Sequence, residues 1–285
     1  MSPTTHPRSI GLYESTSLSK RNGETFFLVW SGVWIALLAF IVLSEAYESF
    51  TPWSYMHVGM FVAIPPCVLP LMFPGWCDDP ALPWRRRYTT KANVWIGVYS
   101  FVGNYLWTHY FYHILHVKYT FDAHRLNDVP FALYLITHGY FHFYHVISSR
   151  LLRIVSRTGP ATTTLLRQSC VVLALSYATA FMEAFTIQGF PYYAYPDQRA
   201  MFTVGSLFYA LYFCVSFPMF YRLDERVCQM WTMRRTLTDV LAACMGVTLL
   251  LDAWRIVVGP IAVVGVVDGA GSPGPLPWMA TTSAK

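Results

Sequence analysis

Long apolar stretches alternate with short polar segments along almost the whole chain. Seven of these stretches contain about 20 residues, the length at which an α-helix crosses the ~30 Å hydrocarbon core of a bilayer. They cover residues 26–44, 55–74, 93–115, 130–148, 168–188, 201–221 and 237–258. The pattern predicts an all-α fold, a polytopic membrane helix bundle with about seven transmembrane helices. The second stretch contains Pro65, Pro66 and Pro70, so that helix is expected to be kinked or broken.

The composition excludes a soluble globular protein. Hydrophobic residues make up 55% of the 285-residue chain and charged residues only 12%, about half the share found in ordinary globular proteins. The mean hydropathy is +0.38. A chain with so few polar groups cannot cover a soluble surface, whereas it can face lipid. The net charge of +5 is small and the basic residues follow membrane topology, which excludes a nucleic-acid-binding function.

The distribution of Lys and Arg predicts the orientation of the helices. The N-terminal arm and every second loop carry fifteen of these residues, whereas the other loops and the C-terminal tail carry four. By the positive-inside rule, the N-terminus and the loops 75–92, 149–167 and 222–236 therefore face the cytoplasm. With seven spans, the C-terminal tail lies on the opposite side.

The chain is expected to contain one membrane domain with an extension at each end. Residues 1–25 are predicted to form a cytoplasmic N-terminal arm, and residues 26–260 a seven-span transmembrane catalytic domain. Residues 261–285 are rich in Gly and Pro and are predicted to form a flexible C-terminal tail. The six cysteines include no Cys-x-x-Cys pair, so the sequence indicates neither a zinc site nor a disulfide.

Several ionisable residues lie inside the predicted spans. Each costs about 2.5–3.5 kcal/mol to insert at the centre of a bilayer, so each needs a structural or functional reason. From the helical rise of about 1.5 Å per residue, His109, His138, Glu183 and Asp252 share a depth in the non-cytoplasmic half. Depth alone does not establish contact, but a polar cavity in that half of the bundle is the simplest arrangement.

Glu183 is the strongest candidate for a catalytic residue. It has no basic residue within a helical turn, so ionisation is opposed and a neutral acid able to donate a proton is expected. Asp252 and Arg255 are three residues apart and can neutralise each other, which makes a structural ion pair about as plausible as a catalytic role. Asn104 is typical of a residue that hydrogen-bonds between helices, with contact to a substrate as the alternative.

Two motifs of the form His-x-x-x-His-x-x-His suggest an alternative function, a membrane di-iron desaturase or hydroxylase of sterols or other lipids. Imidazole ligands suit iron. However, the paired histidines of those enzymes are absent, and both stripes run through the bilayer instead of along its cytoplasmic surface. We therefore expect no metal site. The histidines concerned are His109, His113 and His116 in the third span and His138, His142 and His145 in the fourth.

Five longer motifs resemble the cycloeucalenol cycloisomerase family, the cyclopropyl-sterol isomerases of phytosterol synthesis. They are GNYLWTHYF at 103–111, the NxVP element at 127–130, FPYYAYPD at 190–197, VGSLFYALYFCVSFPMFYRLDE at 204–225 and DAWRIVVGP at 252–260. The resemblance runs in order from about residue 19 to residue 260. One departure is Gln198, which separates Asp197 from Arg199, two residues that are adjacent in the family pattern.

The resemblance implies a multi-pass enzyme of the endoplasmic reticulum membrane. Such an enzyme opens the 9,19-cyclopropane ring of cycloeucalenol to give obtusifoliol, and it uses no cofactor. Ring opening requires a proton delivered to carbon 19, a cation at carbon 9 and removal of the proton on carbon 8. Under this hypothesis Glu183 is the general acid and His109 or His138 is the base. The reverse assignment, with a protonated histidine as donor, is also compatible with the sequence.

The remaining candidates concern binding. Asn127 or Asp128, near the non-cytoplasmic rim, is expected to hold the sterol 3-hydroxyl. The expected partners are a cyclopropyl sterol and membrane lipid, with no nucleic acid and no protein partner. A non-catalytic sterol-binding membrane protein is a further alternative. The other residues expected to line the substrate pocket are Asn104, Tyr105, Trp107 and Tyr177.

Overall fold

The computed structural model describes residues 11–261, and most of these residues are helical. The α-helices are α1 (Leu18–Leu43), α2 (Pro52–Met72), α3 (Pro74–Cys77), α4 (Tyr88–Val102), α5 (Thr108–Ile114), α6 (Phe131–Arg157), α7 (Thr164–Ile187), α8 (Gln198–Ala200), α9 (Ser206–Tyr221) and α10 (Met233–Val257). Short 3-10 turns are η1 (Ala46–Ser49), η2 (Trp84–Arg86), η4 (Ala161–Thr163) and η6 (Val227–Gln229), and π-helical turns are η3 (Gly103–Trp107) and η5 (Met201–Gly205).

Four two-residue strands form two small antiparallel pairs. Strand β1 (Lys118–Tyr119) pairs with β4 (Tyr193–Ala194), which joins two loops that are far apart in the sequence. Strand β2 (Arg125–Leu126) pairs with β3 (Val129–Pro130) across the two-residue turn of Asn127 and Asp128. Both turn residues have positive φ, 52° and 59°, as a tight hairpin turn requires, and Asn and Asp tolerate this conformation better than most residues.

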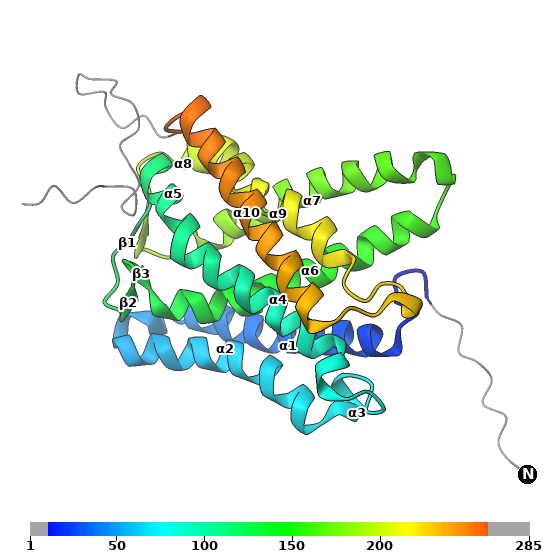
Figure 1. Cartoon of the computed structure of the whole chain (residues 1–285). Coiled ribbons are helices and arrows are strands. Elements are labelled where there is room, and N and C mark those ends of the chain that lie inside the picture. The colour runs from blue at the N-terminus through cyan, green and yellow to red at the C-terminus, as the bar shows by residue number, and fades with distance from the viewer. Residues whose placement is uncertain (1–10, 262–285) are drawn as a thin grey trace, which may run out of the picture.

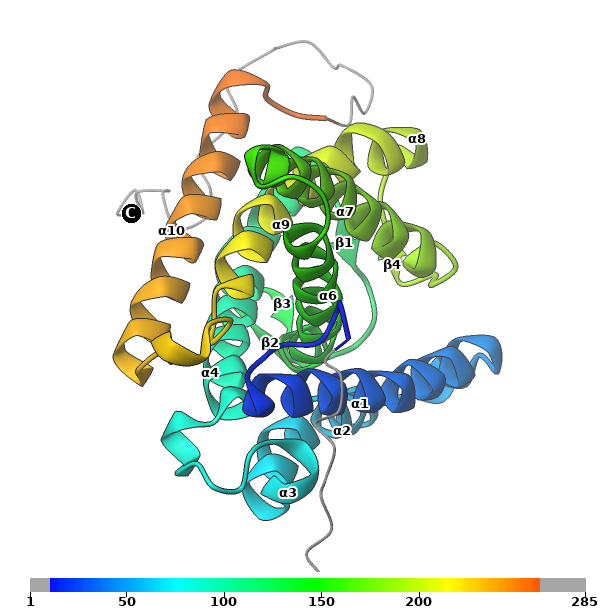
Figure 2. The same ribbon diagram turned by 90° about the vertical axis from the view of Figure 1, so that its right-hand side faces the viewer.

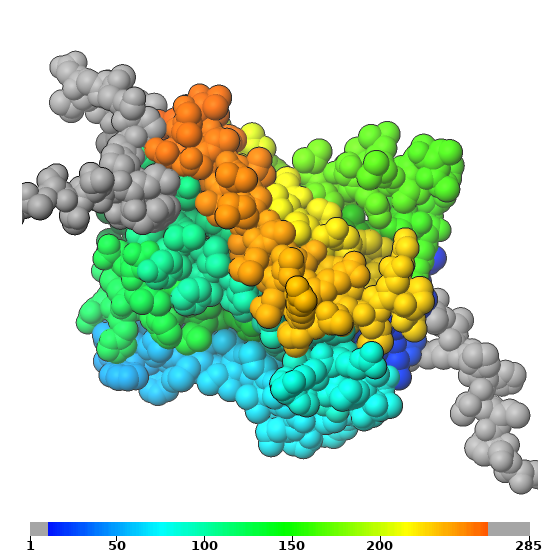
Figure 3. Space-filling view, viewed as in Figure 1, coloured from blue at the N-terminus to red at the C-terminus, as the bar shows by residue number. Residues whose placement is uncertain are grey.

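The long helical segments run up and down through one bundle (Figures 1 and 2). The α1–α2, α5–α6 and α7–α9 connections lie at one end of the bundle, together with the end of α10 (Figure 1). The start of α1 and the α2–α4, α6–α7 and α9–α10 connections lie at the opposite end. Helix α10 crosses one face of the molecule diagonally, where it packs on α4 and α9 (Figure 3). The arrangement matches the alternation of basic and non-basic segments in the sequence.

Within residues 11–261, five helical segments are both long enough and apolar enough to span a membrane. They are α1, α2, α10 and the segments Ala161–Ile187 and Gln198–Tyr221. The other two predicted spans correspond to the helical segment 88–114 and to α6, both of which are long helices. These two carry the histidine motifs, which make them more polar. The prediction of a multi-pass helix bundle is therefore confirmed, whereas the number seven stays a prediction.

Several of the predicted spans differ in detail from the helices observed; α6, for example, ends at Arg157, nine residues beyond the predicted edge at residue 148. Helix α1 begins at Leu18, eight residues before the predicted edge at residue 26, and the Ser17 side chain accepts a hydrogen bond from the backbone N–H of Lys20 as its N-cap. The third span is interrupted by the π-helical turn η3, which contains Asn104. Pi-helical turns of this kind occur frequently at functional sites. The predicted tail, apart from residue 261, lies outside the described residues.

Helix α2 is unbroken despite its three internal prolines. A proline lacks the N–H that would bond the carbonyl four residues earlier, so each proline frees one carbonyl group. Side chains from other elements bond two of these carbonyls. Trp30 Nε1 donates to Val62 O (3.1 Å), which Pro66 frees, and Asn93 Nδ2 donates to Pro66 O (2.7 Å), which Pro70 frees. Arg87 Nη1 donates to Pro70 O (3.4 Å), which is freed by Pro74 of α3. These contacts keep the helix intact, as expected for prolines inside a membrane bundle.

A buried cluster of charged residues ties together the end of the bundle where α1 begins. Arg153 of α6 donates two hydrogen bonds to Glu24 and two to Glu225, all between 2.8 and 3.0 Å. Lys20 Nζ lies 3.0 Å from Glu225 and also donates to two backbone carbonyls after α9. Although burial alone raises the pKa of Glu225, the bonds from Arg153 and the charge of Lys20 outweigh it and lower that pKa below its usual value.

Candidate active site

Glu183 projects from α7, four residues before the helix ends at Ile187, toward α6 and α9. The hydroxyl of Tyr209 donates to Oε1 at 3.0 Å, and the hydroxyl of Tyr144 lies beside the same carboxyl group. Among residues 11–261, Oε2 is buried with no hydrogen-bond partner of regular geometry. Tyr209 therefore holds one carboxyl oxygen, while the other is buried without a hydrogen bond of regular geometry.

The carboxyl group of Glu183 is surrounded by phenol groups, which we call the tyrosine cage. Tyr119 and Tyr193 come from the paired strands β1 and β4, and their rings are 5.0 Å apart. Burial raises the pKa of Tyr193 above its usual value. The members of the cage, each of which interacts electrostatically with Glu183, are Tyr119, Tyr140, Tyr144, Tyr193, Tyr209 and Tyr212.

A second layer of aromatic rings supports the cage from the side of η3 and α5. Phe111 packs against Tyr209 with ring centroids 5.2 Å apart, and Trp107 packs against Tyr212 at 4.8 Å. Trp107 is fully buried, and its Nε1 donates to Thr248 of α10 at 2.9 Å. The predicted pocket residue Trp107 therefore lies behind the cage and positions Tyr212, and it does not itself contact Glu183 in the structure.

His109 lies at the end of the bundle that also contains Glu183. Its Nε2 is 3.0 Å from the carbonyl oxygen of Asn127. Since a carbonyl only accepts hydrogen bonds, Nε2 carries the proton and Nδ1 is the basic atom of the neutral ring. The ring of His109 is 5.5 Å from Tyr112, which in turn is 6.3 Å from the cage member Tyr119. A continuous series of aromatic rings thus connects His109 with the site of Glu183.

His138 lies on the other side of α6. Its Nε2 is 3.0 Å from Oδ1 of Asn93, which also contacts Nε2 of His142 at 3.1 Å. Positions 138 and 142 are separated by two residues, about 200° of helical rotation, from Tyr140 and Tyr144, which face Glu183. The structure therefore does not bring His138 together with Glu183. Equal depth in the bilayer does not determine which face of a helix a side chain occupies, so the shared depth of these two residues does not by itself bring them together.

Three of the other predicted binding residues make local contacts. Asn104 Nδ2 donates to Ser100 O within its own helix at 2.9 Å, so that bond does not join two helices. Tyr105 is partly exposed and stacks on Phe101, and its carbonyl oxygen accepts a bond from Asn127 Nδ2 at 2.6 Å. Asn127 thus links η3 to the β2–β3 turn. Its side chain fixes the loop that holds His109.

Tyr177 and the acidic residues at the rim lie further from Glu183. Tyr177 is two helical turns before Glu183 on α7, and its hydroxyl donates to Phe202 O at 3.3 Å. The backbone carbonyl of Asp128 accepts hydrogen bonds from the Tyr112 hydroxyl and from Arg125 Nη1. The carboxylate of Asp128 makes no hydrogen bond within the described part of the chain. Asp252 and Arg255 are paired, with Nε 2.8 Å from Oδ1.

The histidines of the two motifs do not converge on a common point. His138 and His142 share Asn93, whereas Nε2 of His145 bonds Ser216 of α9 at 2.9 Å. In the described range 11–261, no group of three or more His, Cys, Asp or Glu side chains is placed to hold a metal ion. The residues present therefore do not fit the di-iron centre of a desaturase.

Fold and site together define a multi-pass helical membrane protein with a buried carboxyl group in an aromatic cage. The chain is 43% identical over 257 residues to the cycloeucalenol cycloisomerase of Arabidopsis thaliana, a match that covers 89% of this chain and 91% of the relative. It therefore belongs to the cycloeucalenol cycloisomerase family, as the five sequence motifs predicted, and is an isomerase. No family model matches the chain, and no solved structure matches it.

Proposed function

We propose that this protein opens the 9,19-cyclopropane ring of cycloeucalenol to give obtusifoliol, with Glu183 as the general acid. The observation that carries the proposal is the buried carboxyl group of Glu183, bonded by Tyr209 on one oxygen and unpartnered on the other among the described residues. A carboxyl group in this environment resists ionisation, because a charge inside the bilayer is costly. It can therefore hold a proton and aim it at a substrate without a hydrogen-bonding group of its own.

In the proposed reaction the Glu183 proton adds to carbon 19 as the bond between carbons 9 and 19 breaks. A tertiary cation forms at carbon 9, and the carboxylate left behind keeps the hydrogen bond from Tyr209. Aromatic faces of the tyrosine cage stabilise the cation, an interaction of about 2 kcal/mol or more when water is excluded. Loss of the proton on carbon 8 gives the 8-ene, so one proton enters and one leaves, and no cofactor is required.

We assign the base to His109 in preference to His138. His109 has Nδ1 as its basic atom and is connected to the tyrosine cage through Tyr112. His138 is separated from Glu183 by the thickness of α6, so one sterol molecule cannot contact both side chains. The carboxylate of Asp128, at the rim of the same end of the bundle, is our proposed acceptor for the sterol 3-hydroxyl.

Single-turnover conversion tests the proposed function directly. Purified protein in detergent, mixed in excess over cycloeucalenol, is expected to give obtusifoliol without added cofactor. A protein that retained cycloeucalenol on a sizing column but never converted it would be the non-catalytic sterol binder considered above, and the proposal would fail.

Acid–base ring opening predicts that turnover is independent of metal and oxygen. The reaction neither oxidises nor reduces the sterol, so activity should be unchanged in anaerobic buffer that contains EDTA. The metal content of the active preparation is measured alongside by mass spectrometry. Stoichiometric iron, with activity lost on chelation and restored by Fe²⁺, would support the di-iron alternative.

We further propose that the chain spans the endoplasmic reticulum membrane seven times, with its N-terminus in the cytoplasm. The fifteen-to-four division of basic residues supports this topology, as does the alternation of connections between the two ends of the bundle (Figure 1). In a variant that lacks the six native cysteines, a cysteine introduced at Gln198, in the α7–α9 connection, should resist an impermeant maleimide added outside intact microsomes. The same reagent should label a cysteine introduced at Arg86. Labelling at position 198 without permeabilisation would show that the orientation is wrong.

A further inference from the structure

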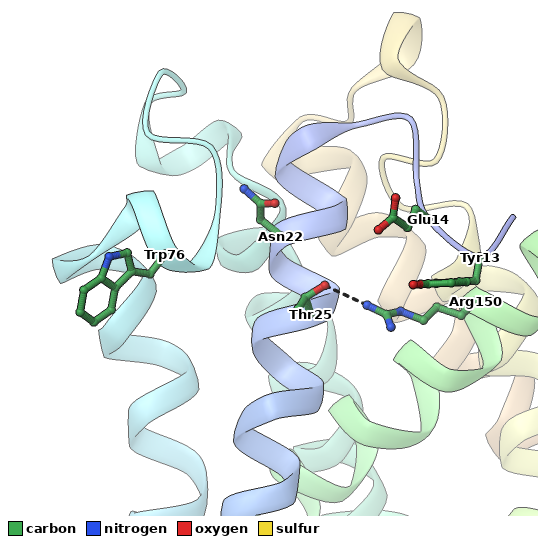
Figure 4. Close-up of a pocket in the computed structure, with 6 residues that line it drawn as sticks. All are labelled: Tyr13, Glu14, Asn22, Thr25, Trp76 and Arg150. Carbon is green, nitrogen blue, oxygen red and sulfur yellow. Dashed lines mark hydrogen bonds between the residues drawn. The ribbon is translucent and has the colours of Figure 1, made fainter. Parts of the chain in front are cut away.

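A cavity lies at the opposite end of the bundle from Glu183, beside the buried charged cluster. It has a volume of about 340 Å³ and lies between the segment that precedes α1, the first turns of α1, α3 and the C-terminal part of α6 (Figure 4). Arg150 of α6 reaches toward α1 along one side of it. The lining residues are Tyr13, Glu14, Asn22, Thr25, Trp76 and Arg150.

In the ion-paired cluster beside this cavity, three positively charged side chains face two carboxylates. Its cations are Lys20, Arg150 and Arg153, and its carboxylates are Glu24 and Glu225. Both carboxylates are engaged at 2.8–3.0 Å by Arg153, and Lys20 shares Glu225. Arg150 reaches Glu24 only at 3.7 Å, so it is the cation whose charge is least compensated.

The guanidinium group of Arg150 is held in position with donors to spare. Its Nη2 donates to Thr25 Oγ1 at 3.0 Å, and the guanidinium lies over the ring of Tyr13, 5.3 Å from the centroid. Nε is buried and faces Glu24 Oε2 at 3.7 Å, whereas Nη1 takes part in no hydrogen bond within residues 11–261. A planar guanidinium whose terminal nitrogens keep free N–H groups at the edge of a cavity suits a phosphate oxygen pair.

We propose that this cavity binds the phosphate group of a zwitterionic phospholipid headgroup. A phosphate on Arg150 gives a close anionic partner to the cation that has the longest ion pair of the cluster, 3.7 Å to Glu24. Glu14 lines the same cavity and forms no ion pair within the described residues, so its carboxylate can receive the ammonium group of such a headgroup. Trp76 is 84% exposed at the rim, a position typical of tryptophan at the boundary between membrane and water.

The surface of α1 favours a lipid over a soluble phosphate ester. Asn22 and Thr25 line the cavity, and Val29 and Val33 continue the same stripe of α1 at helical spacing. Val29 is 66% exposed and Val33 45% exposed. The stripe thus changes from polar at the cavity to apolar along the membrane-facing side, where an acyl chain attached to the headgroup can lie.

Native mass spectrometry of the full-length protein, exchanged into detergent with dioleoylphosphatidylethanolamine, tests this site. Arg150→Gln is expected to reduce the retained lipid at least tenfold relative to the unchanged protein. Arg86→Gln serves as the matched control, since Arg86 is exposed at the same end of the bundle, and it should retain the lipid fully. Equal retention by the two variants would overturn the proposal. Equal binding of soluble glycerophosphoethanolamine would show that the site recognises the phosphate ester alone, and the lipid assignment would then fail.

If Arg150→Gln does not fold, Glu14→Gln can be used instead. Glu14 lies in the segment that precedes α1, outside the helices, so this substitution should leave folding unchanged. It should weaken retention of dioleoylphosphatidylethanolamine while leaving that of dioleoylphosphatidylglycerol, which has no ammonium group, unchanged. If the two lipids respond alike to Glu14→Gln, no zwitterionic headgroup binds there.

Discussion

Glu183→Gln is expected to lower single-turnover conversion of cycloeucalenol at least ~100-fold, which corresponds to about 2.7 kcal/mol in the activation free energy. Glutamine keeps the size of the side chain and can still accept the bond that Tyr209 donates to Oε1. It has no proton acidic enough to add to a cyclopropane. Sterol binding and expression should therefore be close to normal, and the loss should fall on the chemical step. Rapid-quench kinetics measure the chemical step, and equilibrium dialysis of labelled sterol measures binding separately.

Glu45→Gln is the matched control for that experiment. Glu45 is an exposed carboxylate after α1, outside the tyrosine cage, so the variant should convert the sterol at the normal rate. Tyr209→Phe should give an intermediate loss, because it removes the bond that stabilises the Glu183 carboxylate formed in the reaction. Near-normal conversion by Glu183→Gln, together with complete loss in His109→Ala, would show that the proton donor is a histidine.

The sequence predicted the helices well because their lengths are set by the bilayer. Apolar runs of about 20 residues match the thickness of the hydrocarbon core, so the approximate positions and the order of the long helices follow from hydropathy. Where local chemistry overrides hydropathy, the prediction missed. Helix α1 starts early because Ser17 caps it and because Lys20 and Glu24 are buried in the charged cluster. Helix α2 was expected to be kinked or broken; it has no break, because side chains of other elements bond two of the carbonyls that its prolines leave free.

The candidate site was only partly predictable. Glu183 stood out because a carboxyl group in a span without basic neighbours is rare. Its tyrosine partners could not be recognised in the sequence, because aromatic residues make up 17% of the chain and no spacing distinguishes the few that face a carboxyl group. Tyr119 and Tyr193 are 74 positions apart and meet only through the β1–β4 pairing. The depth of His138 was inferred from its position along the helix, but its direction depends on how α6 packs between α4 and α7, which one sequence does not reveal.

Replacement of Arg153 is expected to have the largest effect on stability. Its guanidinium group is 1% exposed and is the only group that holds both Glu24 and Glu225 by hydrogen bonds within the described residues. Arg153→Gln leaves Glu24, also 1% exposed, without its principal partner. Breaking a buried pair from one side in this way typically costs about 3–5 kcal/mol. The free energy of unfolding, measured in mixed micelles with increasing SDS, should fall by about that amount.

Arg222→Gln provides the comparison for Arg153. Arg222 forms a single ion pair with Asp239 at 2.7 Å, but its side chain is 55% exposed, so the expected change in the free energy of unfolding is at most about 1 kcal/mol. The double variant Arg153→Gln, Glu24→Gln should be more stable than Arg153→Gln alone, because it no longer buries an unpaired carboxylate. If Arg153→Gln were no less stable than Arg222→Gln, the cluster would not hold this end of the bundle together. The basic residues there would then serve only to orient the chain in the membrane.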